Sequence, residues 1–547
     1  MSSESSPDIR HFFYPPIMKV ILPALAAACI LVSCTRPSGQ ASTIPAPQLT
    51  KLSEKSINMD AFGSVKHDAE LDNEAEFLAE KLYEAGYDVL GGKGKSIRLR
   101  LDSSLGKEAY VLKARQHSLR ISGGSPAGVF YGIQTMLQEL ATGGLKAGII
   151  EDSPRYAWRG YMLDEARHFS GETRVKEILD LMAYYKMNRF HWHLTDAQGW
   201  RIEIKRYPRL AMVGGEGCHS DPDTPTQYYT QEQIRDMVAY AKARHIEIVP
   251  EIDMPGHATA SNRAYPEYSG GGSPEHPDFT FNVGKEETYE YLGNILSEIA
   301  ELFPFEYMHI GGDEVAYGIE AWETDPHVQD LLTREGLETV RDAERYFMHR
   351  MHKIVADLGK TLVGWDELLD LEVDKTTLIM WWRHDKPENL ARSIEEGYST
   401  VMCPRKPLYF DFVQHESHVW GRVWDGFCPL EDVYNFPDKQ LEEWGCDPDD
   451  PHIVGIQANV WTELMHNKDR VDFMTFPRLC ALAESGWTQP EGKDFASFES
   501  RLEYAYSLFD QMGIYYYDHR DPTHHIEPAG PEIKTNTKVK KAIDFRD

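Results

Sequence analysis

The chain has 547 residues, of which 41% are hydrophobic and 26% are charged. This is the composition of a globular protein long enough for two or more domains, so a mainly disordered chain is excluded. The formal net charge of −30 argues against nucleic acid or an anionic membrane surface as the main partner, because binding phosphate groups requires clustered Lys and Arg.

The first 34 residues are typical of an export signal, and we expect its true start to be Met18. Lys19 gives a short basic region, and residues 20–31 are almost wholly apolar but too short to span a bilayer. The Leu-Val-Ser-Cys sequence at 31–34 resembles a bacterial lipobox, in which the signal is cut before the cysteine and the new terminus is lipidated. We therefore expect an exported lipoprotein anchored through Cys34, periplasmic or associated with the outer membrane. The alternative is an ordinary secretory signal with a chance cysteine.

Two segments separate this signal from the main domain. Residues 35–50 are rich in Pro, Ser, Ala and Gln, which predicts a flexible tether. In residues 51–153, two stretches alternate apolar with polar residues as half-buried strands do, at 97–101 and 119–121, and two others have helical patterns, at 74–85 and 127–140. We expect a small α+β domain over residues 51–153.

Residues 154–517 repeat a helix followed by a strand. One apolar stripe at helical spacing includes Val175, Ile178 and Met182, and a second helix begins at a capping box made by Thr230 and Gln233. Together with further apolar runs, the strands total about eight, which predicts a (β/α)8 barrel. A doubly wound sheet would require a Gly-rich phosphate loop, and no such loop follows an early strand. The expected strands are 160–163, 190–194, 246–252, 307–310, 361–363, 378–380, 400–402 and 453–459.

Polar and aromatic residues follow nearly every expected strand. The active sites of such barrels lie at the carboxyl ends of the strands, so these residues should meet at one rim. Carboxylates, an arginine and several tryptophans suit a neutral polyhydroxylated ligand, because aromatic rings pack on the apolar faces of sugars while charged groups bind hydroxyls. Each carboxylate alone could cap the next helix, and each tryptophan alone could belong to the core. In chain order the residues are Arg167, Asp196, Asp253, His257, Asp313, Glu314, Trp365, Asp366, Glu367, Trp382, Tyr409, Asp411, Trp461 and Glu463.

Asp313 and Glu314 are adjacent carboxylates after Gly311 and Gly312. A retaining glycosidase usually has its two carboxyl groups about 5 Å apart on opposite sides of the scissile bond, contributed by different strands. An adjacent pair suits another division of labour. Glu314 could act as the acid while Asp313 orients a nucleophile belonging to the substrate, its 2-acetamido carbonyl.

The segment from His309 to Val315, His-Ile-Gly-Gly-Asp-Glu-Val, resembles the catalytic motif of glycoside hydrolase family 20, the β-N-acetylhexosaminidases. Other segments are similar to the family in the same order: residues 158–169, 191–196, 250–257, 365–367 and 461–463. The resemblance covers roughly residues 97–517. It implies an exo-acting hydrolase that removes terminal β-linked N-acetylglucosamine or N-acetylgalactosamine from glycans with retention, and that needs no cofactor or metal.

The resemblance also implies a role for each matching residue. Glu314 would be the general acid and base, Asp313 would orient the acetamido group, and Tyr409 would donate a hydrogen bond to its carbonyl. His257 and Asp196 would form a relay behind Glu314. The sugar hydroxyls would be held by Arg167, Asp411 and Glu463, and the pocket lined by Trp365, Trp382 and Trp461. Trp382 is preferred to Trp381 because it directly precedes Arg383.

Two alternatives remain open from the sequence. A metal-dependent barrel hydrolase could use His191, His193, His257 and His309, although bonded histidines filling the barrel explain the same pattern. A catalytically inactive glycan-binding lipoprotein could share the scaffold.

Neither a disulfide framework nor a zinc-type pair can be read from the five later cysteines, Cys218, Cys403, Cys428, Cys446 and Cys480. The polar residues 518–547 form a C-terminal tail with no predicted role.

Overall fold

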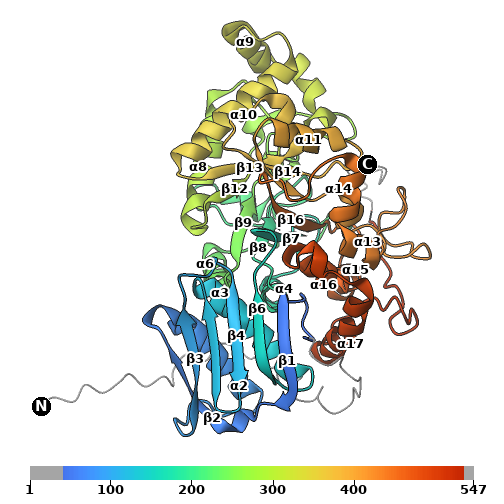
Figure 1. Cartoon of the computed structure of the whole chain (residues 1–547). Helices are drawn as coiled ribbons and strands as arrows, with labels where there is room; N and C mark the ends of the chain where they lie inside the picture. Colours follow the sequence, from blue (N-terminus) through green and yellow to red (C-terminus); the bar gives the residue numbers. More distant parts are fainter. Residues whose placement is uncertain (1–40, 535–547) are drawn as a thin grey trace, which may run out of the picture.

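The computed structural model of the chain describes residues 41–534, which form a smaller domain next to a closed barrel (Figure 1). The expected signal and Cys34 lie outside these residues. Among the helices of residues 41–534, none is both long enough and apolar enough to cross a membrane.

The smaller domain is a six-stranded mixed sheet with two helices, in the strand order β1-β6-β4-β5-β3-β2. Apolar and charged residues alternate along strand β3, so that Ile97 and Leu99 are buried and Arg98 and Arg100 are exposed. Helix α3 packs on β4 and β5, and nearly all of its residues are buried. The elements are β1 (Leu49–Ser56), β2 (Phe62–His67), α2 (Asp72–Glu84), β3 (Lys95–Leu101), β4 (Tyr110–Arg115), β5 (Ser118–Gly123), α3 (Pro126–Ala141) and β6 (Lys146–Asp152).

The larger domain is a closed barrel of eight parallel strands in the order β7-β8-β9-β12-β13-β14-β15-β16. The fold class expected from the sequence is therefore confirmed, and each of the eight expected strands coincides with an observed one. The strands are β7 (Trp158–Asp164), β8 (Arg189–His193), β9 (Glu247–Glu251), β12 (Tyr307–His309), β13 (Thr361–Trp365), β14 (Leu378–Trp381), β15 (Ser399–Met402) and β16 (Ile453–Val460).

Helices surround the barrel as the apolar stripes predict. The capping box is present at Thr230, whose side chain accepts from the backbone N–H of Gln233 at the start of α6. Between β13 and β14 there is only a 3-10 helix, η7 (Asp366–Leu371). The α-helices are α4 (Glu172–Tyr184), α5 (Arg209–Met212), α6 (Gln231–Lys242), α7 (Thr259–Ala264), α8 (Glu286–Leu302), α9 (Pro326–Glu335), α10 (Val340–Asp357), α11 (Pro387–Glu395), α12 (Arg405–Leu408), α13 (Leu430–Asn435), α14 (Asp438–Trp444), α15 (Lys468–Thr475), α16 (Arg478–Trp487) and α17 (Phe495–Met512); β10 (Ser269–Gly271) and β11 (Thr280–Phe281) form a small separate sheet.

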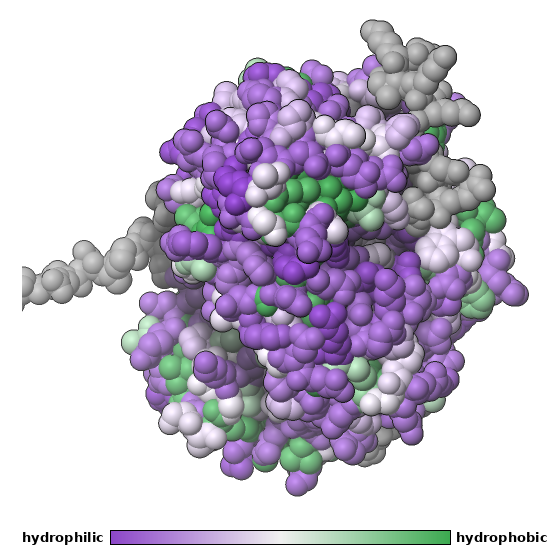
Figure 2. Space-filling model, turned by 90° about the horizontal axis from the view of Figure 1, so that it is seen from above, coloured by the Kyte–Doolittle hydropathy of each residue, from purple (hydrophilic) through white to green (hydrophobic). Residues whose placement is uncertain are grey.

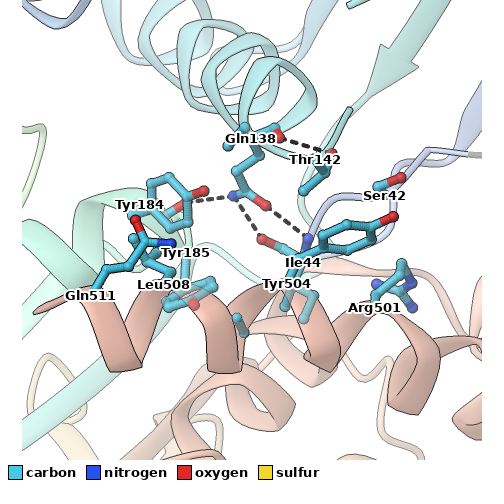
Figure 3. A pocket seen from close by; sticks show the side chains of 12 residues that line it. Ser42, Ile44, Gln138, Thr142, Tyr184, Tyr185, Arg501, Tyr504, Leu508 and Gln511 are labelled. Carbon is cyan, nitrogen blue, oxygen red and sulfur yellow. Dashed lines mark hydrogen bonds between the residues drawn. The ribbon is translucent and has the colours of Figure 1, made fainter. Parts of the chain in front are cut away.

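Residues 41–50 correct the prediction of a flexible tether over 35–50. Thr43 and Ile44 are buried between α3 and α17, and β1 already begins at Leu49. Gln138 of α3 accepts from the backbone N–H of Ile44 and donates to its carbonyl, both at 2.9 Å (Figure 3). Arg501 of α17 donates to the Thr43 carbonyl at 2.8 Å. The polar composition therefore reflects hydrogen bonding between the two domains.

Buried charges also join the domains. Arg159 of β7 is fully buried, and its Nη2 lies 2.9 Å from Glu108 Oε1 in the smaller domain. Lys186 is equally buried, and its Nζ lies 3.1 Å from Asp152 Oδ2 at the end of β6. Removing one partner of such a pair leaves an uncompensated buried charge, so these contacts fix the smaller domain against the barrel.

The surface seen in Figure 2 is mainly hydrophilic with small hydrophobic patches, in keeping with the net charge of −30. Most of the exposed large hydrophobic side chains in residues 41–534 come from one loop between β15 and α13. They are Val419, Trp420, Val423, Trp424 and Phe427. Of the described tail, residues 518–534, none belongs to a helix or strand.

Candidate active site

The sequence-predicted site residues follow the barrel strands and form one connected set of contacts at the rim. Asp196 follows β8, His257 follows β9, and Asp313 and Glu314 follow β12. The remaining members come from five other strand ends. All of them except Asp411 touch another member of the set through the contacts described below, and Asp411 is joined to the set through Arg422. The remaining members are Arg167 after β7, Trp365 at the end of β13, Trp382 after β14, Tyr409 and Asp411 after β15, and Trp461 and Glu463 after β16.

The turn after β12 presents the two carboxylates in a conformation that needs its glycines. Gly311 and Gly312 have φ of 69° and 93°, a region that favours glycine. A Cβ at Gly311 would come 1.8 Å from Asp253 Oδ1, so a side chain there is excluded. Glu314 itself is left-handed with φ 52°, a strained conformation of the kind that gathers at functional sites.

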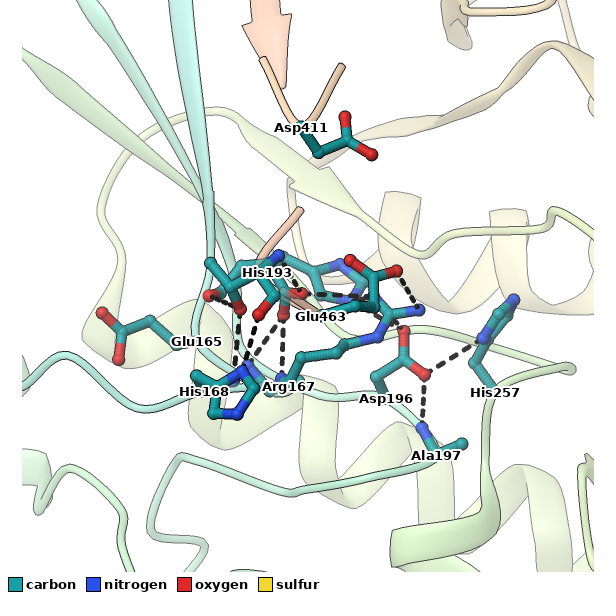
Figure 4. A network of polar contacts seen from close by, with 12 residues as sticks. Glu165, Arg167, His168, His193, Asp196, Ala197, His257, Asp411 and Glu463 are labelled. Atoms are coloured by element: carbon teal, nitrogen blue, oxygen red, sulfur yellow. Dashed lines mark hydrogen bonds and ion pairs between the residues drawn. The ribbon is translucent and has the colours of Figure 1, made fainter. Parts of the chain in front are cut away.

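His257 links these carboxylates to Asp196. Its Nδ1 lies 3.1 Å from Asp196 Oδ1, and its Nε2 lies 3.3 Å from Glu314 Oε2 and 3.6 Å from Asp313 Oδ2. Asp196 also lies 2.7 Å from Arg167, so it stands between a cation and an imidazole (Figure 4). The geometry is that of a carboxylate–imidazole–carboxylate relay.

The charges in this relay separate the two neighbouring carboxylates. Burial raises the pKa of Asp313 to about 7, against the opposing positive charge of His257. Burial also acts to raise the pKa of Glu314, but its contact with His257 and the charges of nearby arginines outweigh this and hold that pKa below its usual value. Burial likewise disfavours a charged His257, yet the surrounding carboxylates, Asp196 first, raise its pKa well above the usual value. The two directions favour an imidazolium at His257 between Asp196 and an ionised Glu314.

Four aromatic side chains form one wall beside the carboxylates. Trp382 stacks on Tyr409 with ring centroids 6.1 Å apart and planes at 13°. The Trp461 ring lies 6.0 Å from the rings of Tyr409 and Trp365. Trp381 is instead fully buried against Trp444, because neighbouring residues of a strand point to opposite faces. Of the two adjacent tryptophans, Trp382 is thus the one that reaches the rim.

Charged groups lie next to this aromatic wall and form the charged side of the site. Arg167 lies with its guanidinium 5.1 Å from the Trp461 ring centre and 4.0 Å from Glu463 Oε1. Arg422 pairs closely with Asp411 and lies 3.6 Å from Glu463 Oε1. The sequence did not point to Arg422, because it follows no strand and belongs to no recognised motif.

Several buried polar atoms in the site make no hydrogen bond within residues 41–534. They include Asp313 Oδ1, Asp411 Oδ1 and Trp461 Nε1. A buried polar atom without a partner costs free energy, and such atoms are rare in folded proteins. These two acceptors and one donor are therefore available to a ligand rich in hydroxyl and amide groups.

Three of the four histidines of the metal alternative surround Glu251 inside the barrel, while His257 lies in the relay and forms a second possible metal-binding group with Asp253 and Asp313. His191 Nε2 and His309 Nδ1 each lie 2.9 Å from a Glu251 oxygen, and His193 contacts the same carboxylate. The ligand atoms of His191, Glu251 and His309 lie within 4.8 Å of one another, which is close enough for a metal. The same atoms also serve the protein: His309 Nδ1 accepts from Gly311 N at 3.0 Å, and all these residues are fully buried or nearly so. A catalytic metal needs an open coordination position, which this buried cluster does not offer.

The cluster has a structural use instead. Glu251 accepts from Trp365 Nε1 at 3.0 Å, and His193 joins Glu251 to Asp196, whose Oδ2 lies 3.0 Å from His193 Nε2. Glu367 similarly holds Trp382, accepting from its Nε1 at 3.0 Å. The buried acids thus fix both the aromatic wall and the relay.

Comparison with known families gives two matches that together span most of the chain. The model described as "Glycosyl hydrolase family 20, catalytic domain" matches residues 156–490, and "Glycosyl hydrolase family 20, domain 2" matches residues 40–153. A β-hexosaminidase of Porphyromonas gingivalis is 35% identical over 87% of this chain, and the match spans 64% of that relative's length. A β-hexosaminidase of Vibrio furnissii is 36% identical over 71% of this chain and 67% of its own.

Solved structures agree with these matches. An exo-β-N-acetylglucosaminidase from Vibrio harveyi, solved in complex with N-acetylglucosamine, superposes with a TM-score of 0.79 at 33% identity, covering 89% of this chain and 80% of that one. A β-N-acetylhexosaminidase from Streptomyces coelicolor gives a TM-score of 0.76 at 31% identity, covering 89% and 99%.

Proposed function

The chain belongs to glycosyl hydrolase family 20, and we propose that it is an exo-acting β-N-acetylhexosaminidase. Its substrates are glycans with a terminal, non-reducing, β-linked N-acetylglucosamine or N-acetylgalactosamine. The reaction proceeds with retention of configuration, and the nucleophile is the acetamido oxygen of the substrate itself.

The adjacency of Asp313 and Glu314 carries this proposal. Both carboxylates lie within 3.6 Å of one imidazole nitrogen, His257 Nε2, so they act from the same side of the site. A carboxylate nucleophile would have to stand across the sugar from the acid. The acetamido oxygen fills that role: it attacks the anomeric carbon, the glycosidic bond breaks, and the leaving oxygen takes a proton from Glu314. The attack joins the acetamido oxygen to the anomeric carbon in a cyclic intermediate. Water activated by Glu314 then attacks the anomeric carbon and opens this ring.

The polar network supports a separate task for each acid. Asp313 accepts from the acetamido N–H through its free Oδ1, which aligns the carbonyl for attack. Glu314 is the more accessible of the two, with 29% of its side chain exposed against 13% for Asp313, so it can reach the leaving oxygen. A bound sugar removes water from Glu314 and so favours its protonated form, and His257 is the proton donor at hand, 3.3 Å away.

The surrounding walls suit one terminal sugar. Tyr409 donates to the acetamido carbonyl, and Trp365, Trp382 and Trp461 enclose the ring and its acetyl methyl group. Hydroxyl groups bind on the charged side, to Arg167, Asp411 and Glu463. Arg422 neutralises two of these carboxylates and so permits them to lie close together.

A small substrate panel tests the function. The purified full chain is assayed on aryl and oligosaccharide β-glycosides of N-acetylglucosamine and N-acetylgalactosamine, and on matching β-glucosides, which lack the acetamido group. We expect turnover of the N-acetylated substrates with the β-anomer as first product by proton NMR, and none of the β-glucosides. Folded protein that binds N-acetylglucosamine without any turnover would instead indicate a glycan-binding protein.

We also propose that the protein is exported and anchored to a membrane through a lipid on Cys34. The support is the apolar segment 20–31, which ends in the Leu-Val-Ser-Cys sequence at 31–34. Expression in a bacterial host with labelled palmitate should give a labelled protein, and Cys34→Ala should abolish the label. An unlabelled wild-type protein released in soluble form would contradict the anchor.

A further inference from the structure

The C-terminal segment, residues 518–534, follows the last helix and crosses two loops at the rim of the site. One is the Arg422 loop, defined as residues 411–428, which begins at Asp411. The other is the His219 loop, defined as residues 217–224. The segment lies beyond residue 490, where the match to the catalytic-domain family model ends. Its contacts with both loops are specific.

Glu527 makes the first contact, with the backbone of the Arg422 loop. Its two carboxylate oxygens accept from the N–H groups of Val419 and Trp420, each at 2.9 Å. On its other side lies Arg470 of helix α15, fully buried, with Nη1 3.4 Å from Glu527 Oε1 and 3.2 Å from the Pro528 carbonyl. Hydrogen bonds to a charged acceptor are the stronger kind. Glu527 therefore ties the backbone of an exposed loop to a barrel helix.

Trp420 and Lys534 extend this contact. The backbone at Gly530 lies directly under Trp420, so that a Cβ at residue 530 would come 2.5 Å from Trp420 Cε3. Lys534 N donates to the Ser220 carbonyl at 2.8 Å, and its Nζ lies 2.6 Å from Asp221 Oδ2. The same short segment thus reaches the His219 loop.

Both loops carry groups that set the sugar-binding side. Gly421 packs against the Asp411 carbonyl with no room for a side chain, since a Cβ there would come 2.7 Å from it, and Arg422 N donates to the same carbonyl at 2.8 Å. Residues 419–420 directly precede this packed turn, so a shift of them would disturb the position from which Arg422 reaches Asp411 and Glu463. In the His219 loop, His219 N donates to the Arg167 carbonyl at 2.9 Å.

We propose that residues 518–534 act as a clasp that holds the Arg422 and His219 loops in their binding positions, with Glu527 as the positioning residue for Arg422. The inference rests on the proposed function, since it assigns the clasp to the hydroxyl-binding side of that site. Loops at a rim open easily unless their backbone is bonded to a rigid element, and Glu527 supplies that bond from α15. The clasp makes no contact with the sugar. It preorganises groups that do, which lowers the cost of ordering them on binding.

Substitutions in the full chain test the clasp, because loss of a positioning residue should change KM much more than kcat. Glu527→Ala removes both acceptors, Glu527→Gln keeps one oxygen, and Glu532→Ala is the matched control on an exposed residue of the same segment. With an aryl β-N-acetylglucosaminide, Glu527→Ala should raise KM about fivefold to thirtyfold, as expected when bonds from a charged group are lost. The kcat should stay within about threefold, Glu527→Gln should be intermediate, and the control should match wild type. An unchanged KM with a lower kcat would mean loss of folded enzyme only and would overturn the positioning role.

Amide hydrogen exchange gives a readout that needs no turnover. Exchange at Val419 and Trp420 should become faster in Glu527→Ala and stay unchanged in Glu532→Ala. Gly530→Val, which pushes Trp420 away without touching the carboxylate, should also raise both the exchange rate and KM. If wild type hydrolyses nothing, the proposed function fails while exchange still tests the clasp. Exchange at 419–420 that is the same in all four proteins would overturn the clasp.

Discussion

His257 Nε2 lies 3.3 Å from Glu314 Oε2, so the acid of the site is in contact with an imidazolium and not with bulk water alone. The contact lowers the pKa of Glu314 in the free protein while supplying a proton when the carboxylate is desolvated. The acid's role can be separated from that of Asp313 by changing the leaving group.

Glu314→Gln should lower kcat/KM on unactivated oligosaccharides by about a hundredfold to ten-thousandfold, because their leaving oxygen must be protonated. An aryl glycoside with a very acidic phenol needs little protonation and should lose far less in its glycosylation step. Asp313→Asn is the contrast, since orientation of the acetamide is needed for both substrates and both should slow alike. Equal losses on the two substrates in Glu314→Gln would argue against Glu314 as the acid.

Arg422→Met should raise KM by about tenfold to a hundredfold, because it leaves Asp411 and Glu463 close together without their shared cation. Burial already raises the pKa of Asp411 to about 6 against the opposing charge of Arg422, and removing that charge favours the neutral acid further. Steady-state kinetics measure the change. Arg392→Met, on the outer helix α11, is the matched control. A KM in Arg422→Met equal to that of wild type would show that Arg422 does not contribute to substrate binding.

Glu165→Gln should stabilise the protein at alkaline pH. Burial raises the pKa of Glu165 to about 8, and its Oε2 accepts from Ser170 N at 2.8 Å and Tyr229 OH at 3.1 Å. A raised folded-state pKa means that the neutral acid is favoured on folding. Its contribution is fully present below the unfolded pKa of about 4.5 and is lost as the pH rises through about 8.

The glutamine side chain stays neutral at every pH, so melting temperatures of the variant and wild type should agree below about pH 4.5 and separate progressively between pH 4.5 and 8, with the variant higher by a few degrees above pH 8. A constant difference across this range would show that Glu165 does not titrate in the folded protein.

Exhaustive chelation should leave turnover unchanged, because the histidines around Glu251 are buried inside the barrel and leave no open coordination position for a catalytic metal. Metal analysis of the purified chain by mass spectrometry should find less than stoichiometric transition metal, and added zinc should give no stimulation. Activity lost on chelation and restored by one metal would reinstate the metal-dependent hydrolase.

The barrel could be predicted from the sequence because its signals are local. A strand buried on both faces appears as an apolar run, and the capping box of α6 depends only on Thr230 and Gln233. The rim residues followed from the strand ends. Whether Cys218, Cys403, Cys428, Cys446 and Cys480 pair could not be read from spacing, and in the structure all five are free.

Other features depend on partners far away in the chain. The polar residues near Thr43 are buried because Gln138 and Arg501 supply hydrogen bonds, which composition alone cannot reveal. Arg422 acquires its place from the fold of the Arg422 loop and from contacts with Glu463, not from a motif. Glu527 could not be predicted for the same reason, since the two backbone N–H groups that donate to it lie about a hundred residues earlier in the chain. The roles of residues whose partners are distant in the sequence could therefore be identified only from the structure.

The central claim is that Asp313 and Glu314 serve a nucleophile that the substrate provides. Successive fluorination of the acetyl group of an aryl β-N-acetylglucosaminide measures this directly. Each fluorine withdraws electrons from the carbonyl oxygen and weakens it as a nucleophile, whereas the aryl leaving group stays the same. We predict that turnover falls steeply from the acetyl to the monofluoro-, difluoro- and trifluoroacetyl substrates. Turnover that is insensitive to fluorination would contradict substrate assistance and would require a nucleophile from the protein.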